Sequence, residues 1–321
     1  MLDIPFEEGY IPFKIPSIDK PCSTYFKVFG DLSCGRSPVI CLHAGPGHVH
    51  QIQIDFAELW PRHGVPVIFY DMIGFGQSTN LDEKAGNQSF WDMSLFVSEL
   101  ENVVNHFRLH DDLGFSLLGV SLGAMLALDF AVRKPRGLRL LVLGSPSGSF
   151  EDFISGINAR RSELPPHAQE ALNEACDKQD FQSEAWKEGA TMYFGRYLCR
   201  ADPMPERLQK TLQDTKPPNT VLGAMLGPCH MGTRPGSLKT WNIISQLHQI
   251  DVDTLMWNGE FDQVTDTCVQ PLFQKIPRVR WRTFSGASHI NTLEGDELRN
   301  GCINLVGDFL NQLEPTQTAT S

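Results

Sequence analysis

Several features that would assign the chain to a particular class are missing from its 321 residues. No two of its eight cysteines form a C-x-x-C pair, and none has the Cys/His spacing of a structural zinc site. No apolar run approaches the ~18 residues of a membrane span, and the N-terminus lacks the basic start and apolar segment of a secretory signal. We therefore expect reduced thiols, no structural metal, and the cytoplasm as the default location.

Positive charge is also scarce, because 27 Lys and Arg stand against 38 Asp and Glu, for a net charge of −11. Such a chain has no surplus of cations to displace counterions from nucleic acid or to bind an anionic membrane. Nucleic acid and membrane are therefore excluded as partners, and a small-molecule or short peptide substrate is left. The oligomeric state stays open.

Motifs for cofactors are absent as well. Gly45-x-Gly47 is followed by His50 where a dinucleotide loop needs glycine, and there is no G-x-x-x-x-G-K-[ST] string. The cluster of His43, His48 and His50 has no carboxylate at helical spacing to complete a metal site. We expect neither a cofactor nor a metal ion.

What is present is the composition of a folded protein, with 41% hydrophobic and 20% charged residues. Continuous apolar runs separated by helical patterns indicate a mostly parallel sheet that is buried on both faces and flanked by helices. Short segments of alternating apolar and polar residues predict two earlier strands at about 10–15 and 25–29. The apolar runs lie at 38–42, 67–70, 115–118, 138–143, 254–257 and 279–284.

The strand pattern stops between about 147 and 240, where the chain is polar, helical in pattern and rich in proline. We interpret 147–240 as a helical cap, or lid, inserted into an α/β core formed by 1–146 and 241–313. Residues 314–321 are expected to be a disordered tail. Within the core, 90–108 has an apolar helical stripe with Glu99 and Glu101 off its face.

A nucleophile is suggested by Gly119-x-Ser121-x-Gly123, which lies between a predicted strand and a predicted helix. Small residues on both sides of a serine allow the strained turn that lifts its hydroxyl above the edge of a sheet. The string by itself is weak evidence, because a glycine-bounded strand-to-helix connection looks the same.

An acid and a base follow later strands in the order Ser, Asp, His that this serine motif requires. Asp262 comes just after the strand at 254–257, and His289 just after the strand at 279–284. Each alone could be a turn carboxylate or a capping histidine. Together they predict a catalytic triad with Ser121, in which Asp262 orients the histidine in preference to the neighbouring acids Asp253, Asp266 and Glu294.

The oxyanion of the reaction needs two N–H donors. The backbone N–H of Leu122, directly after the nucleophile, is one candidate. Gly45 in the loop His43-Ala44-Gly45-Pro46-Gly47 is the other, because its lack of a side chain allows close approach of a carbonyl group.

Together these motifs resemble the α/β-hydrolase superfamily and, within it, the proline iminopeptidase branch of serine peptidases. The resemblance covers about 20–312 and implies a parallel sheet with a helical cap and an oxyanion hole from Gly45 and Leu122. The motifs that carry it are His43-Ala44-Gly45-Pro46-Gly47, Asp71-x-x-Gly74-x-Gly76-x-Ser78, Gly119-x-Ser121-x-Gly123, Gly259-x-x-Asp262 and Gly286-x-x-His289.

The chain departs from that branch where the family holds a substrate's ammonium group. The family usually has a Glu after the catalytic Asp and a second Glu in a cap segment that starts Gly-Pro, but here these positions are Gln263 and His230. Burying an ammonium without a carboxylate costs several kcal/mol. Ala44 and Val120 also make the expected pocket more apolar.

We therefore expect a serine hydrolase that forms an acyl-enzyme with an uncharged ester, lactone or amide, in the synthesis or breakdown of a metabolite. A prolyl aminopeptidase is one alternative. A non-hydrolytic cyclase or a binding protein on the same fold is another, and covalent labelling by a fluorophosphonate would separate these classes.

Overall fold

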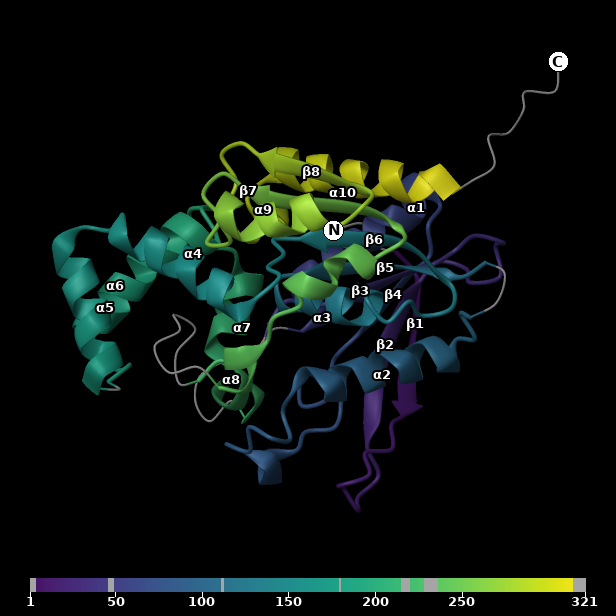
Figure 1. The fold of residues 1–321 in the computed structure, drawn as a ribbon, viewed down its shortest axis with the longest axis horizontal. Coiled ribbons are helices and arrows are strands. Elements are labelled where there is room, and N and C mark those ends of the chain that lie inside the picture. The colour runs from purple at the N-terminus through teal and green to yellow at the C-terminus, as the bar shows by residue number, and fades with distance from the viewer. Residues whose placement is uncertain are drawn as a thin grey trace.

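A computed structural model describes residues 4–45, 49–110, 113–178, 180–214, 220–227 and 236–313. At its centre is an eight-stranded sheet in the order β1-β2-β4-β3-β5-β6-β7-β8 (Figure 1). The strands are β1 (Phe6–Pro12), β2 (Ser23–Phe29), β3 (Val39–Leu42), β4 (Val67–Tyr70), β5 (Phe115–Val120), β6 (Leu138–Gly144), β7 (Asp253–Gly259) and β8 (Val279–Phe284).

The sheet is antiparallel only at one edge, where β2 pairs with both β1 and β4. The remaining neighbours, from β4 to β8, are parallel. The expected α/β-hydrolase architecture is therefore confirmed. The first strand begins at Phe6, four residues before the predicted start, because an edge strand can be exposed and needs no apolar run.

Two apolar layers cover the faces of the sheet. Successive residues of β3 alternate between them, with Ile40 and Leu42 in one layer and Val39 and Cys41 in the other. Figure 1 shows α1 and α10 together on one side and α2 with α3 on the other. The helices that flank the sheet are α1 (Leu59–His63), α2 (Met93–His106), α3 (Leu122–Ala131), α9 (Asp266–Lys275) and α10 (Asp296–Leu310).

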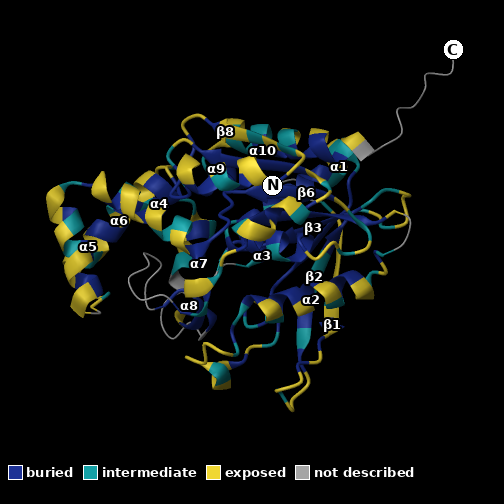
Figure 2. Ribbon diagram, viewed as in Figure 1, coloured by how far each residue is buried: buried dark blue, intermediate teal, exposed yellow. Residues whose placement is uncertain are grey.

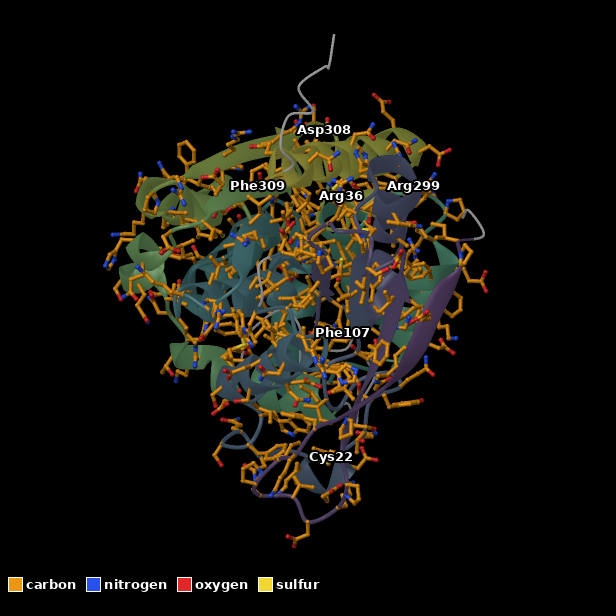
Figure 3. The ribbon with its side chains drawn as sticks, turned by 90° about the vertical axis from the view of Figure 1, so that its right-hand side faces the viewer. Cys22, Arg36, Phe107, Arg299, Asp308 and Phe309 are labelled. Carbon is orange, nitrogen blue, oxygen red and sulfur yellow. The ribbon has the colours of Figure 1, made fainter. Side chains whose placement is uncertain are left out.

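The buried side chains fill both sides of the sheet. In Figure 3, Phe309 of α10 and Phe107, which follows α2, belong to the two different layers. Figure 2 shows the strands as mainly buried and the outer surfaces of the helices as exposed. This burial on both faces explains why the central strands are apolar throughout.

Between β6 and β7 the chain forms helices, which we call the helical insertion. Ser149 and Asn242 form an isolated bridge where the insertion leaves the core and returns to it, and α5 and α6 project away from the sheet (Figure 1). The helices are α4 (Phe150–Ser162), α5 (Pro166–Lys178), α6 (Glu184–Tyr193), the π-helix η3 (Phe194–Leu198), α7 (Glu206–Asp214) and α8 (Thr220–Met225). The predicted tail, 314–321, lies outside the described residues.

The prediction that Glu99 lies off the buried face of its helix is wrong. Its side chain is fully buried, and its carboxyl accepts the Ile73 N–H at 2.9 Å and bonds to the Thr24 hydroxyl. The turn after β4 covers this side of α2, and its backbone N–H needs a buried acceptor. Burial raises the pKa of Glu99 to about 8.

Candidate active site

Ser121 occupies a strained turn between β5 and α3. Its backbone has φ 55° and ψ −117°, a conformation that costs a non-glycine residue of order 1–3 kcal/mol. The turn leaves no room for side chains at its flanks: a Cβ on Gly119 would lie 2.2 Å from the Gly123 oxygen, and one on Gly123 would lie 2.1 Å from the Leu42 oxygen. The two glycines of the motif therefore have a steric cause.

Asp262 and His289 come together beyond the carboxyl ends of the parallel strands. The turns that hold them follow the adjacent parallel strands β7 and β8, while Ser121 follows β5 two strands away. His289 Nδ1 donates to Asp262 Oδ1 at 2.7 Å, and both side chains are buried. This bond leaves Nε2 as the ring nitrogen for proton transfer.

The other acids considered for this role have partners elsewhere. Asp266 accepts from the Asn258 amide at 2.8 Å, and Asp253 pairs with Arg278 at 2.8 Å. Glu294 accepts the Ser288 N–H at 2.7 Å. Of the four acids, Asp262 is the one whose carboxylate bonds to the His289 ring.

Ser145, which the sequence analysis missed, contacts the same carboxylate. Its hydroxyl donates to Asp262 Oδ2 at 2.5 Å, and the Val264 N–H donates to Oδ1 at 2.8 Å. Ser145 has φ 48°, and the preceding Gly144 carbonyl accepts the Ser121 N–H at 2.9 Å. The end of β6 therefore touches both the serine turn and the acid. The sequence signal that could have identified Ser145 is that it directly follows β6, the strand between β5 and β7.

The loop after β3 is held by a neutral histidine. Burial lowers the pKa of His43, whose Nδ1 donates to the Ala44 carbonyl at 2.8 Å and whose Nε2 accepts the Met72 N–H at 3.0 Å. The Ala44 N–H donates to Gln53 Oε1 at 3.1 Å. These bonds fix the backbone directly before Gly45, which is half-buried.

Leu122, the other predicted oxyanion donor, is the first residue of α3. The N–H groups of a first helical turn have no acceptor within the helix, and they lie at its positive end. An anion next to Ser121 would meet this N–H.

Ala44 and Val120 line a small, mainly apolar cavity beside His289. Its volume is about 10 Å³, room for about one water molecule. Phe56 and Trp257 are among the other residues that line it. Two predicted pocket residues thus lie near the histidine, but this cavity is too small to hold a substrate group.

Gln263 is buried at the contact between the acid's loop and the helical insertion. The Tyr193 hydroxyl donates to Gln263 Oε1 at 3.3 Å. Burial, with the charge of Asp262 adding to it, raises the pKa of Tyr193, so this hydroxyl keeps its proton. The remaining pocket candidate, His230, lies outside the described residues.

The histidines considered as metal ligands serve the loops instead. His50 donates through Nδ1 to Asp71 at 2.8 Å, and Gly76 is needed because a Cβ there would lie 2.2 Å from the same carboxylate. His48 lies outside the described residues. Across the described ranges, no three His, Cys, Asp or Glu side chains gather as metal ligands would.

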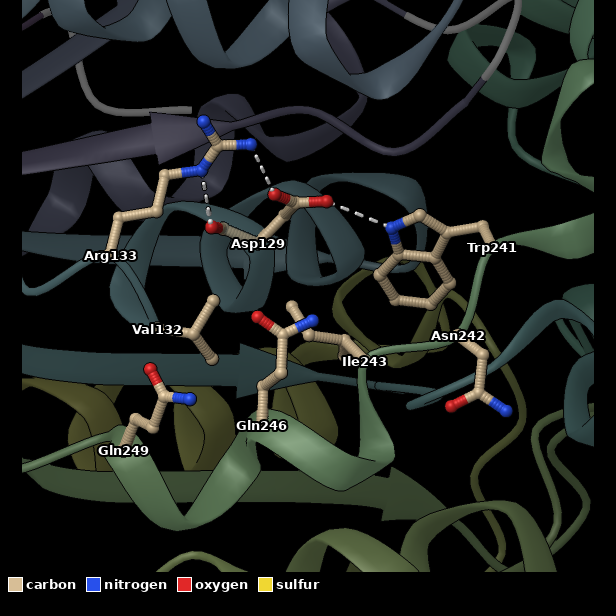
Figure 4. Close-up of a pocket in the computed structure, with 8 residues that line it drawn as sticks. All are labelled: Asp129, Val132, Arg133, Trp241, Asn242, Ile243, Gln246 and Gln249. Carbon is tan, nitrogen blue, oxygen red and sulfur yellow. Dashed lines mark hydrogen bonds and ion pairs between the residues drawn. The ribbon is translucent and has the colours of Figure 1, made fainter.

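A larger hollow of about 470 Å³ lies at the far end of α3 (Figure 4). There the Asp129 carboxylate accepts from Arg133 at 2.9 Å and from the Trp241 indole at 3.0 Å, so its charge is already paired. Ser121, Asp262 and His289 are not among the residues that line it. The hollow is separate from the residues that carry the expected chemistry.

Comparisons with known proteins show that this chain is similar to serine peptidases. Residues 35–176 match the family described as serine aminopeptidase, S33. A proline iminopeptidase of Thermoplasma volcanium is 28% identical over 288 residues, which cover 90% of this chain and 92% of the relative. In the described part of the chain no helix is long and apolar enough to cross a membrane.

Two solved structures are similar over almost the whole chain. The crystal structure of VinJ has a TM-score of 0.88 and 30% identity, and the match covers 96% of this chain and 99% of VinJ. A proline iminopeptidase of Mycobacterium smegmatis has a TM-score of 0.84 and 28% identity, with coverage of 95% and 98%. The similarity therefore includes both the sheet and the helical insertion.

Proposed function

The chain belongs to the α/β-hydrolase superfamily, in its proline iminopeptidase-like branch, and from this premise we propose that Ser121, His289 and Asp262 are the catalytic triad of a serine hydrolase. The observation that carries the proposal is the 2.7 Å bond between the buried side chains of His289 and Asp262, at the carboxyl ends of the parallel strands, where Ser121 also lies. The strained backbone of Ser121 supports the same assignment.

The reaction runs in two steps. His289 Nε2 takes the Ser121 proton as the hydroxyl oxygen attacks the substrate carbonyl, and it then gives that proton to the leaving group. Asp262 holds the ring through Nδ1 and stabilises the imidazolium. The N–H groups of Gly45 and Leu122 stabilise the oxyanion, and water releases the acyl group by the reverse sequence.

The helical insertion serves as the lid of this site, with the boundaries 147–240 between the two parts of the core. The Tyr197 carbonyl accepts the His289 N–H at 3.3 Å, and the Leu198 carbonyl accepts the Ile290 N–H at 2.9 Å. These contacts support a lid on the catalytic side of the sheet, where it would exclude water and shape the substrate pocket.

The substrate is an uncharged ester, lactone or amide. Gln263 stands where the branch usually has a carboxylate, and its Oε1 is already bonded to Tyr193. Nearby Glu260 accepts from the Gly286 N–H at 2.8 Å and from the Ser285 hydroxyl at 3.0 Å, so it is occupied on the outer side of the turn. An ammonium group would lack a free carboxylate among these residues.

The alternative is prolyl aminopeptidase activity, which is favoured by the names of the curated relatives at about a quarter identity. The two are separated by a pair of substrates with the same leaving group: proline p-nitroanilide and cyclopentanecarboxylic p-nitroanilide, which differ by the ring amine. Preference for the uncharged ring supports our proposal, whereas preference for proline assigns the aminopeptidase activity.

Covalent labelling tests the triad independently of the substrate. A fluorophosphonate should label the wild-type protein and fail to label Ser121→Ala, because the hydroxyl is the attacking group. Unlabelled wild type would favour a binding protein or a cyclase that does not activate this serine.

A further inference from the structure

One arginine of the helical insertion bonds to the turn that carries Asp262. Arg160, on α4, donates from Nε to the Asp262 carbonyl at 2.9 Å and from Nη2 to the Glu260 carbonyl at 2.7 Å. Its third nitrogen, Nη1, donates to the Glu163 carboxylate at 3.1 Å. The Arg160 side chain is only 15% exposed, and its bond to the Asp262 carbonyl is part-buried, whereas its bonds to Glu260 and Glu163 lie at the surface.

The same arginine reaches the loop of His289 through Tyr197. Its guanidinium lies 5.4 Å from the centre of the Tyr197 ring. The Tyr197 hydroxyl donates to Glu163 at 3.1 Å, and the Tyr197 carbonyl accepts the His289 N–H at 3.3 Å. Arg160, Glu163 and Tyr197, which we call the Arg160 bridge, therefore contact the backbone of both catalytic loops.

The geometry suits a guanidinium in particular. The carbonyls of Glu260 and Asp262 flank Phe261, and a planar fork can bond both at once in one fixed orientation. An ammonium group has no such fork. Phe261 is itself covered by another arginine of the insertion, Arg200, at 3.9 Å. The direction in which Asp262 projects depends on this turn, because the side chain follows the backbone.

We propose that Arg160 is a positioning residue of the catalytic site. This proposal rests on the triad proposed above. Through the Arg160 bridge the helical insertion completes the alignment of Asp262 and His289, in addition to covering the substrate. A displacement of about 1 Å in a catalytic group can cost on the order of 100-fold in rate. Loss of the two bonds that hold the backbone around Asp262 is therefore expected to lower the rate.

The test uses p-nitrophenyl acetate, whose two-carbon acyl group is too short to depend on a specificity pocket in the insertion. Arg160→Met keeps an unbranched side chain about as long as the aliphatic stem of arginine but removes the guanidinium and its donors. We expect kcat to fall roughly 10- to 100-fold with KM little changed, and fluorophosphonate labelling to slow in parallel. Arg160→Lys should recover part of the loss, because one ammonium can bond one of the two carbonyls.

The matched control is Arg161→Met. Arg161 is the next residue of α4 and is also buried, but it bonds within the insertion, to Asn173 at 2.5 Å. This variant should keep kcat within about twofold, because it leaves the acid's turn untouched. Tyr197→Phe, which removes the hydroxyl that bonds to Glu163 but keeps the ring under Arg160, should cause a smaller loss than Arg160→Met and remain folded.

Three results would overturn the proposal: an unchanged kcat in Arg160→Met, an equal loss in Arg161→Met, or a loss that appears in KM alone. If Arg160→Met does not fold, Arg160→Lys and Tyr197→Phe decide by the same criteria. Failure of the proposed function is distinguishable, because the wild-type protein itself would then take no fluorophosphonate label.

Discussion

Replacing Glu99 by glutamine should change how the stability of the protein depends on pH. Glu99 is fully buried on α2, and its carboxyl bonds to the Ile73 N–H and the Thr24 hydroxyl. Burial raises the pKa of Glu99 from the ordinary value of 4.5 to about 8. Glutamine has nearly the same shape, can accept from Ile73 and donate to Thr24, and carries no charge at any pH.

The sign follows from proton binding. Between pH 4.5 and 8 the folded protein holds a proton on Glu99 that the unfolded chain releases, so stability falls as pH rises through this window and levels off above it. Each pKa unit corresponds to about 1.4 kcal/mol. Integrating the two titration curves from pH 5 to pH 8 gives a loss of roughly 3–4 kcal/mol from this residue, which Glu99→Gln should not show.

Urea unfolding followed by tryptophan fluorescence at pH 5, 6.5 and 8 measures this effect. Relative to the wild type, the free energy of unfolding of the variant should rise by roughly 3–4 kcal/mol from pH 5 to pH 8, with an unchanged slope against urea concentration. Glu101→Gln is the control, because Glu101 is exposed on the same helix. Other titrating groups are common to both proteins and cancel. Parallel pH curves for wild type and Glu99→Gln would refute the reasoning.

Three further predictions concern the acid and its surroundings. Asp262→Asn should lower kcat roughly a thousandfold or more because the amide favours the wrong His289 tautomer, whereas Asp266→Asn should retain kcat; the reverse order in steady-state kinetics would contradict the assignment. Ser145→Ala should lower kcat roughly 3- to 30-fold, since it removes a buried hydrogen bond to the carboxylate, and an unchanged kcat would deny Ser145 that role. Gln263→Glu should improve kcat/KM for proline p-nitroanilide relative to its cyclopentane analogue by introducing a carboxylate for the amine; an unaltered ratio would place Gln263 outside the substrate pocket.

The local sequence pattern was sufficient to predict the central strands and the end of the sheet at which the candidate residues lie. The strands β4 and β8 have the predicted bounds, 67–70 and 279–284. A strand buried on both faces must be apolar along its length, and parallel strands end at the same edge. Knowing which residues follow the strand ends therefore placed Ser121, Asp262 and His289 on one rim without any knowledge of distances.

Tertiary structure decided the contacts between residues that are far apart in the chain. Ser145 and Asp262 are separated by 117 positions, and Arg160 and Asp262 by 102. Neither a serine after a strand nor an arginine in a polar helix differs locally from a surface residue. Their roles depend on which elements the fold brings together.

Glu99 shows the same limit from the opposite direction. Helical periodicity describes one apolar stripe, but the fold also packs the turn after β4 against α2, where the carboxyl accepts the N–H of a residue 26 positions away. Hydrophobic pattern is a property of neighbouring residues, and it determined the sheet and its rim. Burial of a polar group depends on a distant partner that satisfies its hydrogen bonds, so only the assembled structure could decide it.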